Sequence, residues 1–152
     1  MYSEAEPKEG MMSQESTLKR TSTIGRDLHV MLVEDEPVEL EIYRQKFASW
    51  DIPMQLTSAE NGINALLKLN QVSPDLIITD LNMPIMDGFQ MMRMLHQSIR
   101  SQNTHFVVVT GVPLDEVRLR DDFPPGVTLV SKPVDFASLE QIVRDRADGI
   151  TC

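Results

Sequence analysis

The residues best suited to chemistry are polar side chains that directly follow short apolar runs. One of them, Asp80, comes after the run 76–79 and is followed by the turn-forming residues Asn82, Pro84 and Gly88. Short apolar runs bounded by such residues are typical of buried strands rather than helices. The carboxyl end of a strand in an open α/β sheet is where ligands bind. Asp80 is therefore a candidate for chemistry rather than for packing.

Similar polar side chains stand at the ends of other predicted strands. Because parallel strands bring their carboxyl ends to one edge of a sheet, three carboxylates, a hydroxyl and an ammonium should converge there. The converging side chains are Glu34, Asp35, Asp80, Thr110 and Lys132.

This group predicts phosphoryl chemistry that depends on a divalent metal ion. Neighbouring carboxylates repel one another by ~1 to 4 kcal/mol per pair, and a divalent cation relieves this cost. Oxygen ligands with room for water and phosphate suit Mg²⁺ or Mn²⁺, with Asp35 binding directly and Glu34 partly through water. Asp80 could attack phosphorus and form an aspartyl phosphate, while Thr110 and Lys132 bind the phosphoryl oxygens.

Each residue alone has a simpler interpretation. A single Asp at a strand end is more often a turn or helix cap, and the pair Glu34 and Asp35 could merely favour a helix N-terminus. Thr110 could be only a β-former, and Lys132 only a solvated charge. Their combination at successive strand ends favours a site.

Strands and helices alternate along the chain, which predicts an α/β fold with a parallel sheet covered on both faces. The expected strands are 28–33, 53–58, 75–79, 105–110 and 127–130. The expected helices are 37–49, 62–70, 88–97, a short or distorted one within 113–120, and 136–148, which should stop near Gly149. The first helix carries Val38, Ile42 and Phe47 on one broad face, and the third should present Phe89, Met92 and Leu95 inward. The second helix carries the apolar residues Ile63, Leu66, Leu67 and Leu69.

Composition limits the class of protein. The 152 residues, 41% of them hydrophobic, suffice for one domain with a short appendage. We expect a mobile tail at 1–27, a folded domain at 28–148 and a short end at 149–152, because the first 27 residues lack apolar periodicity. The net charge of −9 argues against a nucleic-acid-binding surface. With no long apolar run or signal peptide, we expect a cytoplasmic protein that does not contact membranes.

Four stretches resemble the receiver domain of bacterial two-component response regulators, over about residues 28–148. They are Leu-Val-Glu-Asp-Glu-Pro at 32–37, Asp-Leu-Asn-Met-Pro-Ile-Met-Asp-Gly at 80–88, Val-Val-Thr-Gly at 108–111 and Ser-Lys-Pro at 131–133. The resemblance implies a five-stranded, doubly wound, flavodoxin-like fold with strand order 2-1-3-4-5. It also implies phosphorylation of Asp80 by a histidine kinase or histidine phosphotransfer protein, a metal shell that includes the backbone carbonyl of Asn82, and a cis peptide between Lys132 and Pro133.

One residue departs from the family pattern. Many receivers carry Tyr or Phe three residues before the lysine, and this chain has Leu129 there. Phosphorylation is still expected, and it should reshape a protein-interaction face around 111–123. The target could be a separate protein or a fused output domain, and a homodimer is left open.

Two other functions share parts of this residue pattern. A pseudo-receiver would keep the site without being phosphorylated. A phosphatase of the haloacid dehalogenase type needs an Asp two residues after its nucleophile, where this chain has Asn82. We therefore expect no enzymatic activity beyond self-phosphorylation and slow self-dephosphorylation.

Overall fold

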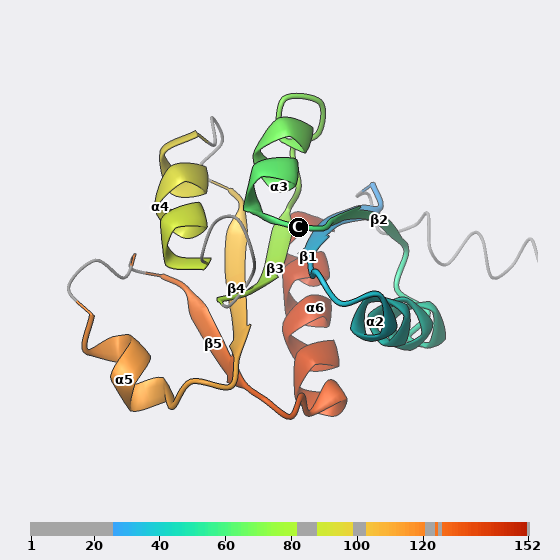
Figure 1. Ribbon diagram of the computed structural model, residues 1–152. Helices are drawn as coiled ribbons and strands as arrows, with labels where there is room; N and C mark the ends of the chain where they lie inside the picture. Colours follow the sequence, from blue (N-terminus) through green and yellow to red (C-terminus); the bar gives the residue numbers. More distant parts are fainter. Residues whose placement is uncertain (1–25, 82–87, 99–102, 121–123, 125, 152) are drawn as a thin grey trace, which may run out of the picture.

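A five-stranded parallel sheet forms the centre of the protein, with strand order β2-β1-β3-β4-β5 (Figure 1). The computed structural model describes residues 26–81, 88–98, 103–120, 124 and 126–151. The strands are β1 (Leu28–Val33), β2 (Met54–Ala59), β3 (Leu76–Asp80), β4 (His105–Thr110) and β5 (Thr128–Ser131). Two strands match their predicted bounds, and the other three begin and end one residue later than predicted. The predicted fold class and strand order are confirmed.

Helices pack on both faces of this sheet. They are α2 (Pro37–Ser49), α3 (Gly62–Lys68), α4 (Gly88–Ser98), α5 (Leu114–Arg118) and α6 (Phe136–Thr151). The short α5 was predicted. The prediction that the last helix stops near Gly149 was wrong, because α6 continues to Thr151. None of the helices in the described ranges is long and apolar enough to span a membrane.

Two apolar cores lie on opposite faces of the sheet, as the alternation of side chains along strands requires. On β1, Met31 belongs to the core that α3, α4 and α5 cover, whereas Leu32 belongs to the core that α2 and α6 cover. Burial of β3 is complete along its length. A central strand buried on both faces is typical of parallel sheets in α/β folds.

The apolar stripe predicted for α2 was partly wrong. Val38 is 70% exposed and Ile42 is also exposed, whereas Tyr43 and Phe47 are buried. A helix turns only one stripe of its surface toward a sheet, and here the aromatic pair occupies it. Tyr43 and Phe47 lie one turn apart with ring centroids 5.8 Å from each other. On α3, Ile63 and Leu67 are exposed for the same reason.

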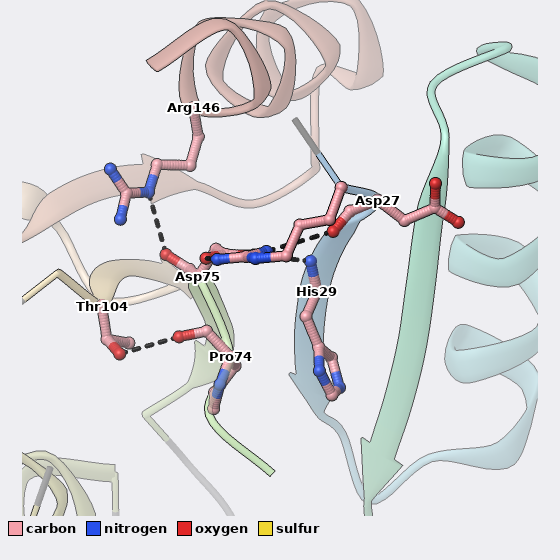
Figure 2. A network of polar contacts seen from close by, with 7 residues as sticks. Asp27, His29, Pro74, Asp75, Thr104 and Arg146 are labelled. Atoms are coloured by element: carbon pink, nitrogen blue, oxygen red, sulfur yellow. Dashed lines mark hydrogen bonds and ion pairs between the residues drawn. The ribbon is translucent and has the colours of Figure 1, made fainter. Parts of the chain in front are cut away.

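At the amino-terminal edge of the sheet, the buried carboxylate of Asp75 is surrounded by donors (Figure 2). Both terminal nitrogens of Arg26 donate to it at 2.7 Å, and the backbone N–H of His29 donates at 2.8 Å. The backbone carbonyl of Asp75 accepts from the N–H of His105 and from Nε of Arg146, both at 3.0 Å. This cluster joins the start of β3 to three distant parts of the chain.

These donors stabilise the ionised carboxylate. Burial alone would raise the pKa of Asp75, but the hydrogen bonds from Arg26 and from the N–H of His29 outweigh it, so the pKa lies below its ordinary value. A buried charge is tolerated when it is paired and hydrogen-bonded in this way. We therefore assign Asp75 a structural role.

Candidate functional site

The opposite, carboxyl-terminal edge of the sheet holds the predicted site residues. Glu34 comes directly after β1, Asp80 and Thr110 are the last residues of β3 and β4, and Lys132 follows β5. Strand register aligns these ends, because Asp80 pairs with Val109 and Thr110 pairs with Ser131. The parallel arrangement thus brings residues separated by up to about 100 positions to one edge, as the sequence predicted.

Asp80 and Lys132 are in direct contact at this edge. The ammonium of Lys132 donates to Oδ2 of Asp80 at 2.6 Å, and the Asp80 side chain is buried. Burial would lower the pKa of Lys132, but the hydrogen bond and the negative charge of Asp80 raise it above its ordinary value. The lysine is therefore a permanent cation beside the carboxylate, in position to bind an anion added there.

Thr110 is the last residue of β4, pairs with the last residue of β5 and is fully buried. Its backbone carbonyl accepts from the N–H of Lys132 at 2.8 Å, and its hydroxyl oxygen accepts from the N–H of Val112 at 3.0 Å. The hydroxyl is thus linked to the segment that follows β4. Movement of Thr110 Oγ1 would therefore change the surroundings of that segment.

Glu34 is an acid at this edge whose pKa is raised by its surroundings. Its carboxylate is buried and accepts one hydrogen bond, from the N–H of Glu36 at 3.2 Å. Burial raises the pKa of Glu34 to about 7, and the negative charges of Glu39 and Asp80 add to the effect. A carboxylate held at such a cost is stabilised by a bound cation.

The remaining predicted metal ligands are Asp35 and the backbone carbonyl of Asn82. Asp35 is half-buried and directly follows Glu34. Asn82, whose carbonyl was predicted to bind metal, lies outside the described residues. Within the described ranges, no three His, Cys, Asp or Glu side chains are grouped closely enough to hold a metal ion by themselves. The predicted three-carboxylate group is therefore not preformed in the described part of the chain.

Two residues near the site were not predicted as part of it. Oε1 of Glu39, on the first turn of α2, lies 3.4 Å from Nζ of Lys132. Tyr43, one turn further on, is buried, and burial together with the charge of Glu34 raises its pKa. The sequence position of Glu39 could have indicated its place in the site, because it lies one turn after Asp35 on a helix that starts at this edge.

The oxygen donors at this edge are of the chemical kind that Mg²⁺ prefers. They are carboxylates of adjacent elements, and a cation would relieve the cost of ionising the buried Glu34. Lys132 supplies an ammonium beside the carboxylate of Asp80, and Thr110 places a hydroxyl at the end of the neighbouring strand β4. Such a set can stabilise a phosphoryl group attached to Asp80. The peptide between Lys132 and Pro133 is cis, as the resemblance implied.

Comparison with known proteins agrees with this geometry. Residues 30–144 match the response regulator receiver domain family. The chain is 26% identical over 150 residues to the sensor histidine kinase RcsC of Salmonella typhi, covering 99% of this chain and 15% of that protein. The chain therefore spans a small part of the length of this curated relative.

Solved structures show the same fold. The signal receiver domain of an HD domain-containing protein from Pseudomonas fluorescens Pf-5 superimposes with a TM-score of 0.69 at 26% identity, covering 82% of this chain and 97% of that one. The receiver domain of the sensor histidine kinase PA1611 from Pseudomonas aeruginosa PAO1 is described with a magnesium ion in its active site cleft. It superimposes with a TM-score of 0.66 at 22% sequence identity, covering 80% of this chain and 98% of that one.

The family match covers most of the chain, and the sheet order is the one expected of this family. The strand ends also carry the acids, threonine and lysine of the family motifs. The chain belongs to the response regulator receiver domain family, whose members are phosphoacceptors in two-component signalling.

Proposed function

We propose that Asp80 is the phosphoacceptor and that a histidine kinase or histidine phosphotransfer protein is the donor. The observation that supports this proposal best is the 2.6 Å contact between Lys132 and the buried carboxylate of Asp80 at the carboxyl edge of the sheet. Ligands bind at this edge in open α/β folds. A buried carboxylate beside a fixed cation is suited to receive an anionic group.

The transfer would proceed by direct displacement. An oxygen of Asp80 attacks the phosphorus of the donor phosphohistidine, a P–O bond forms, the P–N bond breaks, and the imidazole leaves with its electron pair. Lys132 then binds a phosphoryl oxygen, and the hydroxyl of Thr110 donates to another. Bound Mg²⁺ would neutralise charge on the phosphoryl oxygens.

We propose that Glu34, Asp35 and Asp80 bind this Mg²⁺ with the backbone carbonyl of Asn82, and that Mn²⁺ can replace it. The raised pKa of Glu34 supports this assignment, because a cation relieves the cost of ionising a buried acid. Oxygen ligands are the ones that both ions prefer.

We propose that phosphorylation changes the conformation of the segment after β4. If the Thr110 side chain rotates so that Oγ1 moves toward a phosphoryl oxygen, Oγ1 leaves the N–H of Val112, which donates to it at 3.0 Å in this structure. The following helix α5 is short and ends beside Leu119, which is 81% exposed. Leu129 packs against the core and has no hydroxyl to follow Thr110. We infer that a protein target or an output domain reads the face at 111–120.

The wider context is also a proposal. We propose that residues 28–148 are the receiver domain, and that the domain catalyses only its own phosphorylation and slow dephosphorylation in the cytoplasm. The small fraction of its curated relative that it spans is compatible with a receiver that serves a larger signalling protein.

The phosphoacceptor can be tested with a small-molecule donor. Wild-type protein incubated with phosphoramidate and Mg²⁺ should gain one phosphoryl group by intact mass, and Asp80→Asn should gain none. Asp115→Asn, which removes a fully solvated carboxylate, is the matched control and should behave as wild type. A wild-type protein that gains no mass would support the pseudo-receiver instead.

The proposed output face needs a separate measurement. Beryllofluoride with Mg²⁺ should shift the amide resonances of Val112 and of α5 in the wild-type protein. Unchanged resonances throughout 111–120, with beryllofluoride bound, would contradict the proposed switch.

A further inference from the structure

Lys132 lies between two carboxylates, and only one of them belongs to the proposed phosphoacceptor chemistry. Its ammonium is 2.6 Å from Oδ2 of Asp80 and 3.4 Å from Oε1 of Glu39. The first contact joins the residue after β5 to β3, and the second joins the same residue to α2. The phosphoryl-binding lysine is therefore held from two sides in the resting protein.

The two contacts differ in burial. The Asp80 side chain is 9% exposed, whereas the Glu39 side chain is 45% exposed and that of Lys132 is 27% exposed. The pair with Glu39 is consequently screened by water and weaker than the pair with Asp80. A weak contact of this kind can be exchanged for another acceptor without unfolding the site.

The negative charge of Glu39 affects the pKa of two other groups in the site. It helps raise the pKa of Glu34, and it helps raise the pKa of Lys132. Glu39 is thus electrostatically coupled to a proposed metal ligand and to the proposed phosphoryl-binding lysine. Its position on the first turn of α2 also suits the dipole of that helix, which gives it a purely structural alternative role.

We propose that Glu39 is a positioning residue that competes with the phosphoryl group for the Lys132 ammonium and so opposes the phosphorylated state. This inference rests on the proposed function of Asp80. In the resting site, Glu39 draws the lysine toward α2. When a phosphoryl group is added to Asp80, the lysine turns to a phosphoryl oxygen, and the like charge of Glu39 repels the added anion.

The test measures beryllofluoride affinity at saturating Mg²⁺. Glu39→Gln should bind beryllofluoride about two- to five-fold more tightly than wild type, the range expected for an exposed ion pair. Glu39→Asp, which keeps the charge, should lie between the two. Glu41→Gln is the matched control, because Glu41 is exposed on the same helix and contacts Gln45. It removes the same charge and should leave the affinity at the wild-type value.

A second readout follows the lysine itself without metal or beryllofluoride. The ¹H–¹⁵N resonance of the Lys132 ammonium should move in Glu39→Gln and stay in place in Glu41→Gln. The gain in affinity should also shrink at high salt, because the contact is partly exposed.

The outcomes separate this inference from the proposed function. If wild type binds beryllofluoride and Glu39→Gln binds it equally or more weakly, Glu39 does not compete for the lysine and the inference is wrong. If Glu41→Gln tightens binding as much, general charge is responsible and the inference is also wrong. A wild-type protein that does not bind beryllofluoride at saturating Mg²⁺ would overturn the proposed function as well.

Discussion

Strand β3 has a carboxylate next to each of its ends, and the two carboxylates have very different surroundings. Asp75 precedes the strand and receives two hydrogen bonds from Arg26 and one from the backbone of His29. Asp80 ends the strand and is paired with Lys132, in a region that also holds Glu34 and Glu39. One carboxylate is surrounded by donors, and the other is near further acids.

The difference explains which carboxylate is structural and which is proposed to react. The Asp75 carboxylate is paired with Arg26 and hydrogen-bonded to the backbone, so its contacts hold parts of the chain together. Among the described residues at the edge with Asp80, the acids outnumber the lysine, so the edge favours an added cation. The same strand thus provides a fixed end and a reactive end.

The largest expected effect comes from substituting the two carboxylates in turn. Asp80→Asn should abolish phosphorylation by phosphoramidate while leaving the free energy of unfolding unchanged or higher, because it removes like-charge repulsion. Asp75→Asn should keep phosphorylation and lower the free energy of unfolding by about 2 kcal/mol, since Arg26 loses a buried partner but stays solvated. Intact mass and urea unfolding measure the two effects. A loss of both properties in either variant would contradict the division of roles.

Removing the lysine should produce the next largest effect. Lys132→Met should slow phosphorylation by phosphoramidate about 10²- to 10³-fold, the usual cost of losing one donor to a developing anion. Lys46→Met, which removes an exposed lysine from α2, should keep the wild-type rate. Rates are measured by intact mass over time. Equal rates in the two variants would show that the 2.6 Å contact has no role in transfer.

The burial of Glu34 should make the metal-free protein less stable as the pH rises, because it raises the pKa of this carboxyl group. The pKa of Glu34 is raised from 4.5 to about 7, so the folded state keeps a proton that the unfolded state loses between these values. Its contribution is fully present below about pH 4.5 and is lost as the pH rises to about 7. Relative to Glu34→Gln, the wild type should therefore lose about 3 kcal/mol over this range.

Urea unfolding at several pH values with a chelator measures this difference. Ionisable groups distant from Glu34 contribute equally to both proteins, so they cancel in the difference. A constant difference between wild type and Glu34→Gln from pH 4.5 to 8 would rule out the raised pKa of Glu34.

The smallest expected effect concerns the exposed partner of Asp75. Arg26→Gln should lower the free energy of unfolding by about 1 kcal/mol, because the arginine is largely solvated. The pKa of Asp75 is lowered, so this stability is present above its ordinary value of 3.8 and is lost as the pH falls below it. The deficit should thus disappear in acid. Arg118→Gln, which removes an exposed arginine 3.9 Å from Asp115, should stay near wild type at every pH.

The sequence was sufficient to predict the strands and the polar residues at their ends. β-Branched apolar runs such as the one before Asp80 have strand length and end in turn-forming residues, so both the element and its reactive end could be located. Two strands had the predicted bounds, and three were offset by one residue. Alternation then brought Glu34, Thr110 and Lys132 to the same edge.

Contacts made by helices and by distant residues could not be predicted in the same way. The approach of Glu39 to Lys132 depends on how α2 is rotated against the sheet, and Val38 and Ile42 were placed on the wrong side for that reason. The contact of Arg146 with Asp75 joins residues 71 positions apart, and no periodicity links them.

The complete burial of β3 makes it a built-in reference for hydrogen–deuterium exchange. Leu76 to Thr79 lie between β1 and β4 and are all buried. Amides in such a position exchange only when the whole domain opens, whereas that of Val112 exchanges when a short segment moves. An experiment on the phosphorylated protein can therefore compare the two: a change at Val112 alone reports the switch, and a change at both reports altered global stability.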